Sequence, residues 1–223
     1  MTKQVPTYIA LTDTFAGYGL IPRGGFHPQP EDEVPGNVAT LILVGNAGSD
    51  MWGEFTRMPL DLPNALDNWS QCAIDAVASS AGAEALYPFG GPPFLPFQRW
   101  AQKAEPVHSS PLGILIHPEY GLWHAYRGAL AFGEFIDLPP RVERPLPCET
   151  CADKPCLSTC PVGAFSDDGY DVPVCAGHLK TDAGSDCVSI GCRARRHCPV
   201  GLNYTYSPQQ AGFHMRAFLK AQS

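Results

Sequence analysis

Eight of the nine cysteines in this 223-residue chain lie between positions 148 and 198, at spacings typical of metal ligands. They form two runs, and each run ends on a Cys-Pro pair. The first run is Cys148-x2-Cys151-x4-Cys156-x3-Cys160, and the second is Cys175-x11-Cys187-x4-Cys192-x5-Cys198. Thiolates hold iron–sulfur clusters and structural zinc, and cysteines also form disulfides. The spacing therefore poses a choice among these three kinds of chemistry.

The two cysteine runs resemble those of bacterial two-cluster ferredoxins, in which the fourth cysteine of each run binds the cluster of the other run. The stretch Asp153-Lys154-Pro155 lengthens the first run, and the second run is longer throughout. The resemblance implies two [4Fe–4S] clusters with crossed ligand sets. The first cluster would be held by Cys148, Cys151, Cys156 and Cys198. The second would be held by Cys175, Cys187, Cys192 and Cys160.

Zinc, a single cluster and disulfides remain as alternatives. A disulfide framework needs an oxidising compartment, and no apolar signal segment follows Thr2-Lys3 within residues 1–30. A zinc site uses four ligands in two close pairs, whereas this stretch offers eight cysteines and two Cys-Pro closures. Two clusters are the interpretation that the spacing favours.

The composition also suggests what the chain does not bind. With a net charge of −7 the chain is acidic, so we expect no nucleic-acid partner. No apolar run approaches the ~20 residues that cross a bilayer, so we expect no membrane partner. Reduced thiolates are typical of the cytoplasm, which is the expected location.

Two domains are expected, at residues 1–140 and 141–223. The cysteine-rich stretch is too polar and too rich in Gly and Pro to form its own core, so a metal centre must nucleate it. The residues before it suffice for an independent hydrophobic core. Residues 137–147 form a proline-rich linker that marks the boundary.

Apolar patterns predict several elements. Buried strands are expected at 38–45, 112–117 and 122–138, and a helix at 62–82 that Gly82 ends. Proline excludes regular structure from the aromatic loop at 87–97, and Ser207-Pro208-Gln209-Gln210 begins a C-terminal helix. We expect Cys72 to be a small, buried core residue, because free cysteine is among the most buried residue types.

The segment His117-Pro-Glu-Tyr-Gly-Leu-Trp-His-Ala-Tyr-Arg-Gly128 is the second place where functional residues gather. Taken alone, His117 fits a hydrogen-bonded histidine at a strand end, and Trp123 fits the core. Arg127 stands in an apolar strand, and a guanidinium there needs an anionic or acceptor-rich partner. That partner would be a protein carboxylate or a ligand.

This segment resembles the His-Pro-x-x-Gly-x-Trp-x-Ala-x-Arg-Gly motif of the CblC family, which processes cobalamin, although Leu122 replaces a second glycine often found there. The resemblance covers roughly residues 15–138. It implies a cobalamin cofactor or substrate, bound without its lower-ligand base on cobalt. It also implies a nitroreductase-like α/β domain with an antiparallel sheet. The candidate cobalamin contacts are His117, Gly121, Trp123, Tyr126 and Arg127.

The order of the two regions is similar to that of epoxyqueuosine reductases and reductive dehalogenases, which join a related domain to a C-terminal two-cluster domain. The implied fold class is α+β, a cobalamin-binding domain followed by a ferredoxin-like domain. The implied activity is an oxidoreductase that reduces cobalt and removes the upper ligand by decyanation or dealkylation. An external ferredoxin, flavodoxin or reductase would supply the electrons. Reduction of an organic substrate, or a non-catalytic electron-transfer or cobalamin-delivery role, is the alternative.

A basic group beside the second cysteine run completes the set of candidate residues. It consists of Arg193, Arg195, Arg196 and His197. These side chains would neutralise an anionic cluster, or they would bind an acidic redox partner.

Overall fold

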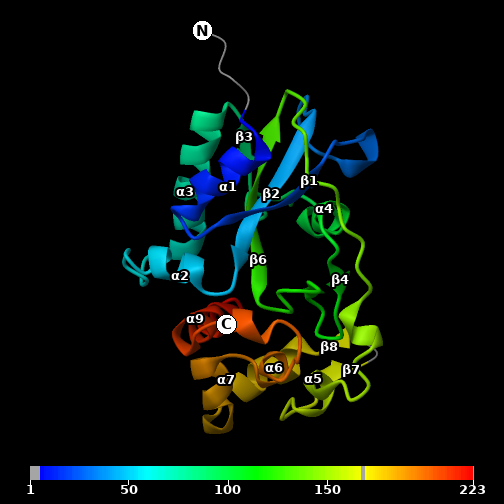
Figure 1. Ribbon diagram of the computed structural model, residues 1–223. Helices are drawn as coiled ribbons and strands as arrows, with labels where there is room; N and C mark the ends of the chain where they lie inside the picture. Colours follow the sequence, from blue (N-terminus) through cyan, green and yellow to red (C-terminus); the bar gives the residue numbers. More distant parts are fainter. Residues whose placement is uncertain (1–5, 167–168, 223) are drawn as a thin grey trace. The chain divides into compact units, whose positions relative to one another are not determined.

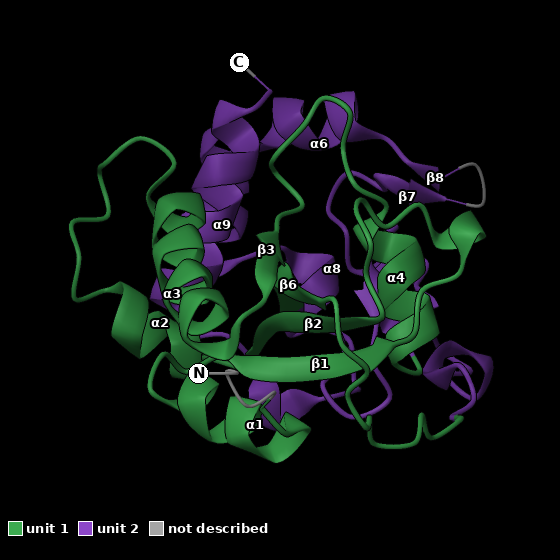
Figure 2. Cartoon of the chain, turned by 90° about the horizontal axis from the view of Figure 1, so that it is seen from above, with its two compact units in different colours: residues 1–106, 125–143 green, residues 107–124, 144–223 purple. Residues whose placement is uncertain are grey.

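The computed structural model describes residues 6–166 and 169–222, and the chain divides into two compact units. The first unit consists of Met1–Pro106 and Ala125–Glu143, and the second of Val107–His124 and Arg144–Ser223 (Figure 2). The later division, at 143/144, falls close to the expected boundary at 140/141. The segment Val107–His124 differs from the expectation, because it belongs to the cysteine-bearing unit.

The core of the first unit is a four-stranded sheet with strand order β1-β2-β6-β3 (Figure 1). Strands β1 with β2, and β3 with β6, pair antiparallel. Leu41, Ile42, Leu43 and Val44 are all fully buried on β2, which explains why this strand reads as a continuous apolar run. The strands are β1 (Ile21–Phe26), β2 (Thr40–Ala47), β3 (Glu84–Leu86) and β6 (His124–Phe132). The mixed α/β composition and the antiparallel pairing are as expected.

Four α-helices and one 3₁₀-helix accompany this sheet among the described residues. They are α1 (Tyr8–Ala16), η1 (Pro30–Asp32), α2 (Asp50–Phe55), α3 (Ala65–Ala81) and α4 (Phe97–Ala104). Helix α3 starts three residues later than its apolar pattern suggests, since Asn64 is the N-cap and Leu62 is exposed. It ends as predicted at Gly82, whose φ of +75° suits the left-handed C-cap.

The prediction for Cys72 is wrong, because this side chain is exposed. The buried face of α3 carries Leu66, Trp69, Ala73 and Val77, which recur at helical spacing. Cys72 precedes Ala73 by one residue, a rotation of about 100° around the helix. It therefore lies off the face that packs on the sheet.

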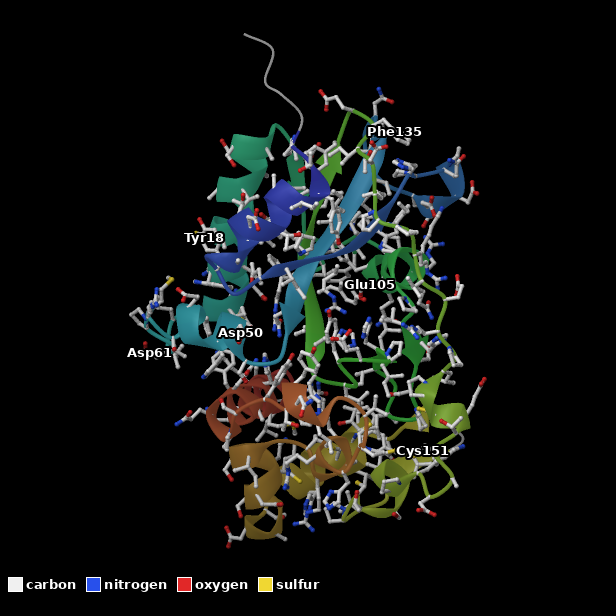
Figure 3. The ribbon with its side chains drawn as sticks, viewed as in Figure 1. Tyr18, Asp50, Asp61, Glu105, Phe135 and Cys151 are labelled. Atoms are coloured by element: carbon white, nitrogen blue, oxygen red, sulfur yellow. The ribbon has the colours of Figure 1, made fainter. Side chains whose placement is uncertain are left out.

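An ion pair that the sequence analysis missed lies in the first unit. Arg23 is fully buried and donates from Nε and Nη2 to the two carboxylate oxygens of Glu105, at 2.8 and 2.7 Å. Its Nη1 donates to the carbonyl oxygen of Asn46, and its guanidinium lies 4.8 Å from the ring centre of Tyr126. The Tyr126 hydroxyl donates to Glu105 at 2.8 Å; Glu105 is labelled in Figure 3. The buried charge is thus paired and hydrogen-bonded, as burial of a charge requires.

Asp32 on η1 provides a pH-dependent contribution to the stability of the first unit. Burial alone would raise its pKa, but hydrogen bonds from the Gln29 N–H and Lys103, together with the charges of Lys103 and Arg99, lower the pKa overall. A carboxyl with a lowered folded pKa stabilises the fold above its ordinary pKa of 3.8, and this contribution disappears as the pH falls through the folded value.

Asp32→Asn should therefore lower the free energy of unfolding by about 1 kcal/mol at neutral pH, the upper end for partly exposed pairs. The difference from the wild type should be constant between pH 5 and 8 and should shrink below about pH 4. Urea unfolding followed by circular dichroism across this pH range measures it. A difference that persists unchanged at low pH would contradict the role of the ionised carboxylate.

Apart from the 13-residue helix α9, the second unit consists of short elements. Its strands are β4 (His108–Ser109), β5 (Leu115–Ile116), β7 (Phe165–Ser166) and β8 (Gly169–Tyr170). Its helices are η2 (Pro147–Glu149), α5 (Pro155–Ser158), α6 (Val172–Leu179), η3 (Asp182–Gly184), α7 (Ser185–Ile190), α8 (Arg193–Arg196), η4 (Leu202–Tyr204) and α9 (Pro208–Lys220). The strand expected at 112–117 shrinks to β5, which pairs with β4 in a hairpin.

The C-terminal helix α9 begins where the sequence predicts. The Ser207 side chain accepts a hydrogen bond from the backbone N–H of Gln210 at 3.2 Å. Gly212 lets α9 pack closely on α7, because a Cβ at this position would lie 2.4 Å from the carbonyl oxygen of Ser189. None of the helices among residues 6–166 and 169–222 is long and apolar enough to cross a membrane.

Candidate iron–sulfur site

The second unit gathers a first group of four cysteines: Cys148, Cys151, Cys156 and Cys198. Burial raises the pKa of the Cys148 thiol, and the neighbouring thiolates of Cys198, Cys156 and Cys151 raise it further. Cys156 has its pKa raised in the same way, by burial and then by Cys198 and Cys151. Cys198 closes the second run along the chain, yet its neighbours come from the first run.

A second group contains the other four: Cys160, Cys175, Cys187 and Cys192. Burial raises the pKa of Cys175, with Cys160 and Cys187 adding to the rise. Burial also raises the pKa of Cys192, and the thiolates of Cys175 and Cys160 act in the same direction. A small cavity is lined by all four of these residues. Cys160, the last cysteine of the first run, therefore lies with the cysteines of the second run, just as Cys198 lies with those of the first.

Short helices and turns of the second unit position these sulfurs and surround them with backbone donors. Cys175 is on α6, Cys187 on α7, and Cys192 is the N-cap of α8. The Cys192 sulfur accepts from the backbone N–H groups of Ala194 and Arg195, and the Cys160 sulfur accepts from the N–H of Ala164 at 3.4 Å. Hydrogen bonds to sulfur are one of the ways in which a protein sets the reduction potential of a cluster.

The two cysteine groups adjoin each other within this unit. Cys160 packs against the apolar cluster that contains Leu112 and Cys198, and also against the cluster that contains Leu179 and Cys187. Cysteines thus make up part of the apolar packing on which the short helices around them depend.

The two groups of four thiols are candidate ligand sets for a metal centre. Within the described ranges, no three His, Cys, Asp or Glu side chains converge as the ligands of one metal ion. A four-iron cluster is wider than one ion, so its four thiolates stand further apart than the ligands of zinc. Three thiols of each group have raised pKa values, and a cationic iron core would offset the repulsion among neighbouring thiolates.

The basic group beside the second run is mostly paired internally. Arg193 and Arg196 both bind Asp186, at 3.0 and 2.8 Å. The guanidinium of Arg195 lies 4.6 Å from the ring centre of Trp123 and 4.7 Å from that of Tyr206. Asp186 thus offsets the charges of Arg193 and Arg196, and both roles of the basic group stay predictions.

The residues of the CblC-like motif are divided between the two units, and each has contacts within its own unit. His117 accepts hydrogen bonds at Nδ1 from the backbone N–H groups of Glu119 and Tyr120, both at 3.1 Å, and stacks on the Tyr120 ring. It therefore holds the turn that follows β5. Trp123 is buried in the second unit with its ring against Tyr206.

Tyr126 and Arg127 lie on β6 in the first unit. The Tyr126 hydroxyl binds Glu105, as described above, and Arg127 Nε donates to Asn46 Oδ1 at 3.2 Å. Burial raises the pKa of the Asp67 carboxyl overall, and the charge of Arg127 opposes part of this rise. Arg127 thus meets acceptor and acidic groups of the protein, one of the two kinds of partner that the sequence suggested.

Gly121 is required by close backbone packing. Its φ is +58°, and a Cβ there would lie 2.0 Å from the carbonyl oxygen of Val200. Gly201 is its counterpart, since a Cβ at that position would lie 2.3 Å from the carbonyl carbon of Tyr120. The two glycines let the turn at 118–121 approach the chain just after Cys198-Pro199.

Gly121→Ala should therefore destabilise the second unit by about 3 kcal/mol, from left-handed strain and displacement of the backbone. Gly113→Ala is the matched control, because Gly113 has a similar φ of +74° but no described atom lies within 4 Å of the place that its Cβ would take. It should cost only about 1 kcal/mol. Thermal unfolding measures both, and equal effects of the two substitutions would contradict the close approach.

Comparison with known proteins gives a likeness to solved structures. No known family matches the sequence, and no curated protein matches it. Among solved structures, an epoxyqueuosine reductase with an epoxyqueuosine-modified tRNA-Tyr stem loop is similar, with a TM-score of 0.48 and 15% identity. The match covers 86% of this chain and 65% of that one. This chain thus spans less than two thirds of that protein's length, and a likeness of this degree does not assign an activity.

The comparison corrects one expectation. The acidic composition led us to exclude a nucleic-acid partner, but the similar structure was solved with a tRNA stem loop, which conflicts with that exclusion. The exclusion was wrong in its reasoning, because net charge says little about how charge is distributed over a surface.

Proposed function

We propose that this chain is an iron–sulfur oxidoreductase with two [4Fe–4S] clusters in its second unit. The observation that carries the proposal is the sorting of eight cysteines into two groups of four, with the last cysteine of each run in the group of the other run. Such crossed ligation is the pattern of two-cluster ferredoxins. Neither zinc binding nor disulfide formation explains why the last cysteine of each run lies in the group of the other run.

Bound [4Fe–4S] clusters would supply one-electron transfer at low potential. The chain's own residues would hold the clusters close together and adjust their potentials. Backbone N–H groups donate to the sulfurs of Cys192 and Cys160, and Arg195 places a positive charge in the same unit. Hydrogen bonds and positive charge near the sulfurs favour the reduced, more negative state.

We further propose a corrinoid as the second redox cofactor, on the resemblance of residues 117–128 to the CblC motif. The proposed contacts remain His117, Gly121, Trp123, Tyr126 and Arg127. Upper-ligand removal was expected as the main activity and substrate reduction as the alternative. The likeness to an epoxyqueuosine reductase agrees with the alternative, so we rank reduction of an organic substrate first. An external low-potential donor is required in either case.

Metal analysis of anaerobically purified protein tests the proposal. We expect about eight iron and about eight acid-labile sulfide per chain, with uptake of about two electrons on reduction. Zinc in place of iron, or about four iron in the intact protein, would overturn the two-cluster proposal. Titration with cyanocobalamin tests the corrinoid separately: a saturable shift of the corrin absorbance bands supports it, and an unchanged spectrum removes it.

A further inference from the structure

Two aromatic neighbours hold the Tyr170 side chain beside the second cysteine group. Tyr170 lies on β8, where it pairs with Phe165 of β7. The rings of these two residues stack with their centres 4.7 Å apart, and Phe218 on α9 stacks on Tyr170 at 6.2 Å. Tyr170 and Phe218 also pack against the buried cluster that contains Cys175. These contacts fix the ring, and they therefore fix the direction of its hydroxyl.

The local fold brings the Cys175 sulfur back to this hydroxyl. Asp171 is the N-cap of α6, and its side chain accepts from the backbone N–H of Val174 at 2.9 Å. Its carbonyl oxygen accepts from the N–H of Cys175 at 3.1 Å, which places Cys175 in the first turn of the helix. Tyr170 and Cys175 line the same mostly apolar cavity. The Tyr170 hydroxyl donates a hydrogen bond to the Cys175 sulfur.

The donor of this hydrogen bond is a side chain, so a substitution can remove it. In the first group, by contrast, Cys156 and Cys198 accept from the backbone N–H groups of Leu157 and Val200. Those donors remain whichever side chain is replaced. A tyrosine hydroxyl keeps its proton at neutral pH, so it can donate to a thiolate.

The effect on a bound cluster follows from charge. Reduction by one electron adds a negative charge that the thiolates share, so a hydrogen bond donated to a thiolate is stronger in the reduced state. Such a bond favours reduction. We propose that the Tyr170 hydroxyl, acting through Cys175, raises the reduction potential of the second cluster. The inference rests on the proposed function, because it requires that Cys175 binds a cluster, and it names a residue that sets the potential of that cluster.

The reduction potentials of Tyr170→Phe test the proposal. This substitution keeps the ring that stacks on Phe165 and Phe218 and removes the hydroxyl. In a redox titration followed by electron paramagnetic resonance, the equilibrium constant of one reduction step should fall about tenfold, which is about 59 mV for one electron. This is the lower end for a hydrogen bond to a charged acceptor, because only the difference between two oxidation states counts. Unchanged potentials, or equal shifts of both steps, would overturn the proposal.

Two further variants locate the effect. Tyr204→Phe is the matched control, because the Tyr204 hydroxyl donates to the carboxylate of Glu119 instead of to a cysteine. It should leave both potentials unchanged. Cys198→Ala removes a proposed ligand of the first cluster and serves as a background in which one step remains. Tyr170→Phe should lower the potential of that step by the same amount, and the absence of a shift there would show that the hydroxyl does not act on the second cluster.

A stronger donor at the same position separates hydrogen bonding from packing. 3-Fluorotyrosine in place of Tyr170 has a more acidic hydroxyl, which donates more strongly to a thiolate. It should therefore raise the potential that Tyr170→Phe lowers. A disturbance of packing gives no reason for opposite signs. If both substitutions shift the potential in the same direction, the effect is not that of the hydrogen bond.

Iron analysis of the same samples separates the two proposals. If the wild type holds about eight iron per chain and its potentials are unchanged in Tyr170→Phe, the proposed function is retained and only this inference is lost. A wild-type protein without iron contradicts the proposed function before any potential is measured.

Discussion

Cys198→Ala should lower the iron content from about eight to about four per chain. Cys198 lies with Cys148, Cys151 and Cys156, although it closes the second run. Removing one of four thiolates leaves the first cluster without a full ligand set, while the second group keeps all its cysteines. Iron and sulfide analysis of the anaerobically purified variant measures the loss. Cys72→Ala is the control, because the ninth cysteine is exposed and belongs to neither group.

Double variants show which cluster Cys198 serves. If Cys198 and Cys151 hold the same cluster, Cys198→Ala combined with Cys151→Ala should retain about four iron. Cys198→Ala combined with Cys187→Ala should retain almost none, because each substitution then removes a different cluster. The reverse result would show that each run holds its own cluster and that the crossed arrangement is wrong.

Arg23→Met should lower the free energy of unfolding by about 3–5 kcal/mol, because it leaves the Glu105 carboxylate without its charged partner. Arg23 is fully buried, and the Glu105 side chain is only 12% exposed. The loss appears as a lower urea midpoint measured by circular dichroism. Arg99→Met is the control, since its partner Glu33 and Arg99 itself are both exposed. Such surface pairs contribute about 1 kcal/mol or less.

The double variant Arg23→Met with Glu105→Leu tests whether this loss comes from the unpaired carboxylate. Replacing a whole buried ion pair by apolar residues is often close to neutral, whereas breaking it is costly. The double variant should therefore be more stable than Arg23→Met alone. If instead the two losses simply add, the cost does not come from an unpaired buried carboxylate.

Local signals in the sequence predicted those features whose cause is local. The apolar run at β2, the glycine that ends α3 and the capping serine of α9 each depend on a few adjacent residues. The crossed assignment of the eight cysteines to two clusters was inferred from the resemblance of the two runs to a known ligand pattern, and it stays a prediction. The corrinoid contacts stay a prediction.

Features that depend on contacts distant in sequence were missed. Arg23 and Glu105 are 82 residues apart, and no local pattern pairs them. The sequence analysis predicted a buried partner for Arg127, because this residue stands in an apolar strand. In the structure it is Arg23 that is fully buried. The segment Val107–His124 was placed in the first domain by its position in the chain. Its packing on Val200 and Leu146 assigns it to the second unit.

The most direct test of the two-cluster proposal is electron paramagnetic resonance of the protein reduced with dithionite. Two [4Fe–4S] clusters held by adjoining cysteine groups should both become paramagnetic, and their spins should couple magnetically. The proposal predicts a signal that integrates to about two spins per chain, broadened by coupling, with narrower lines and about one spin in Cys198→Ala. A single uncoupled signal in the wild type, or no signal from a zinc-containing protein, would contradict it.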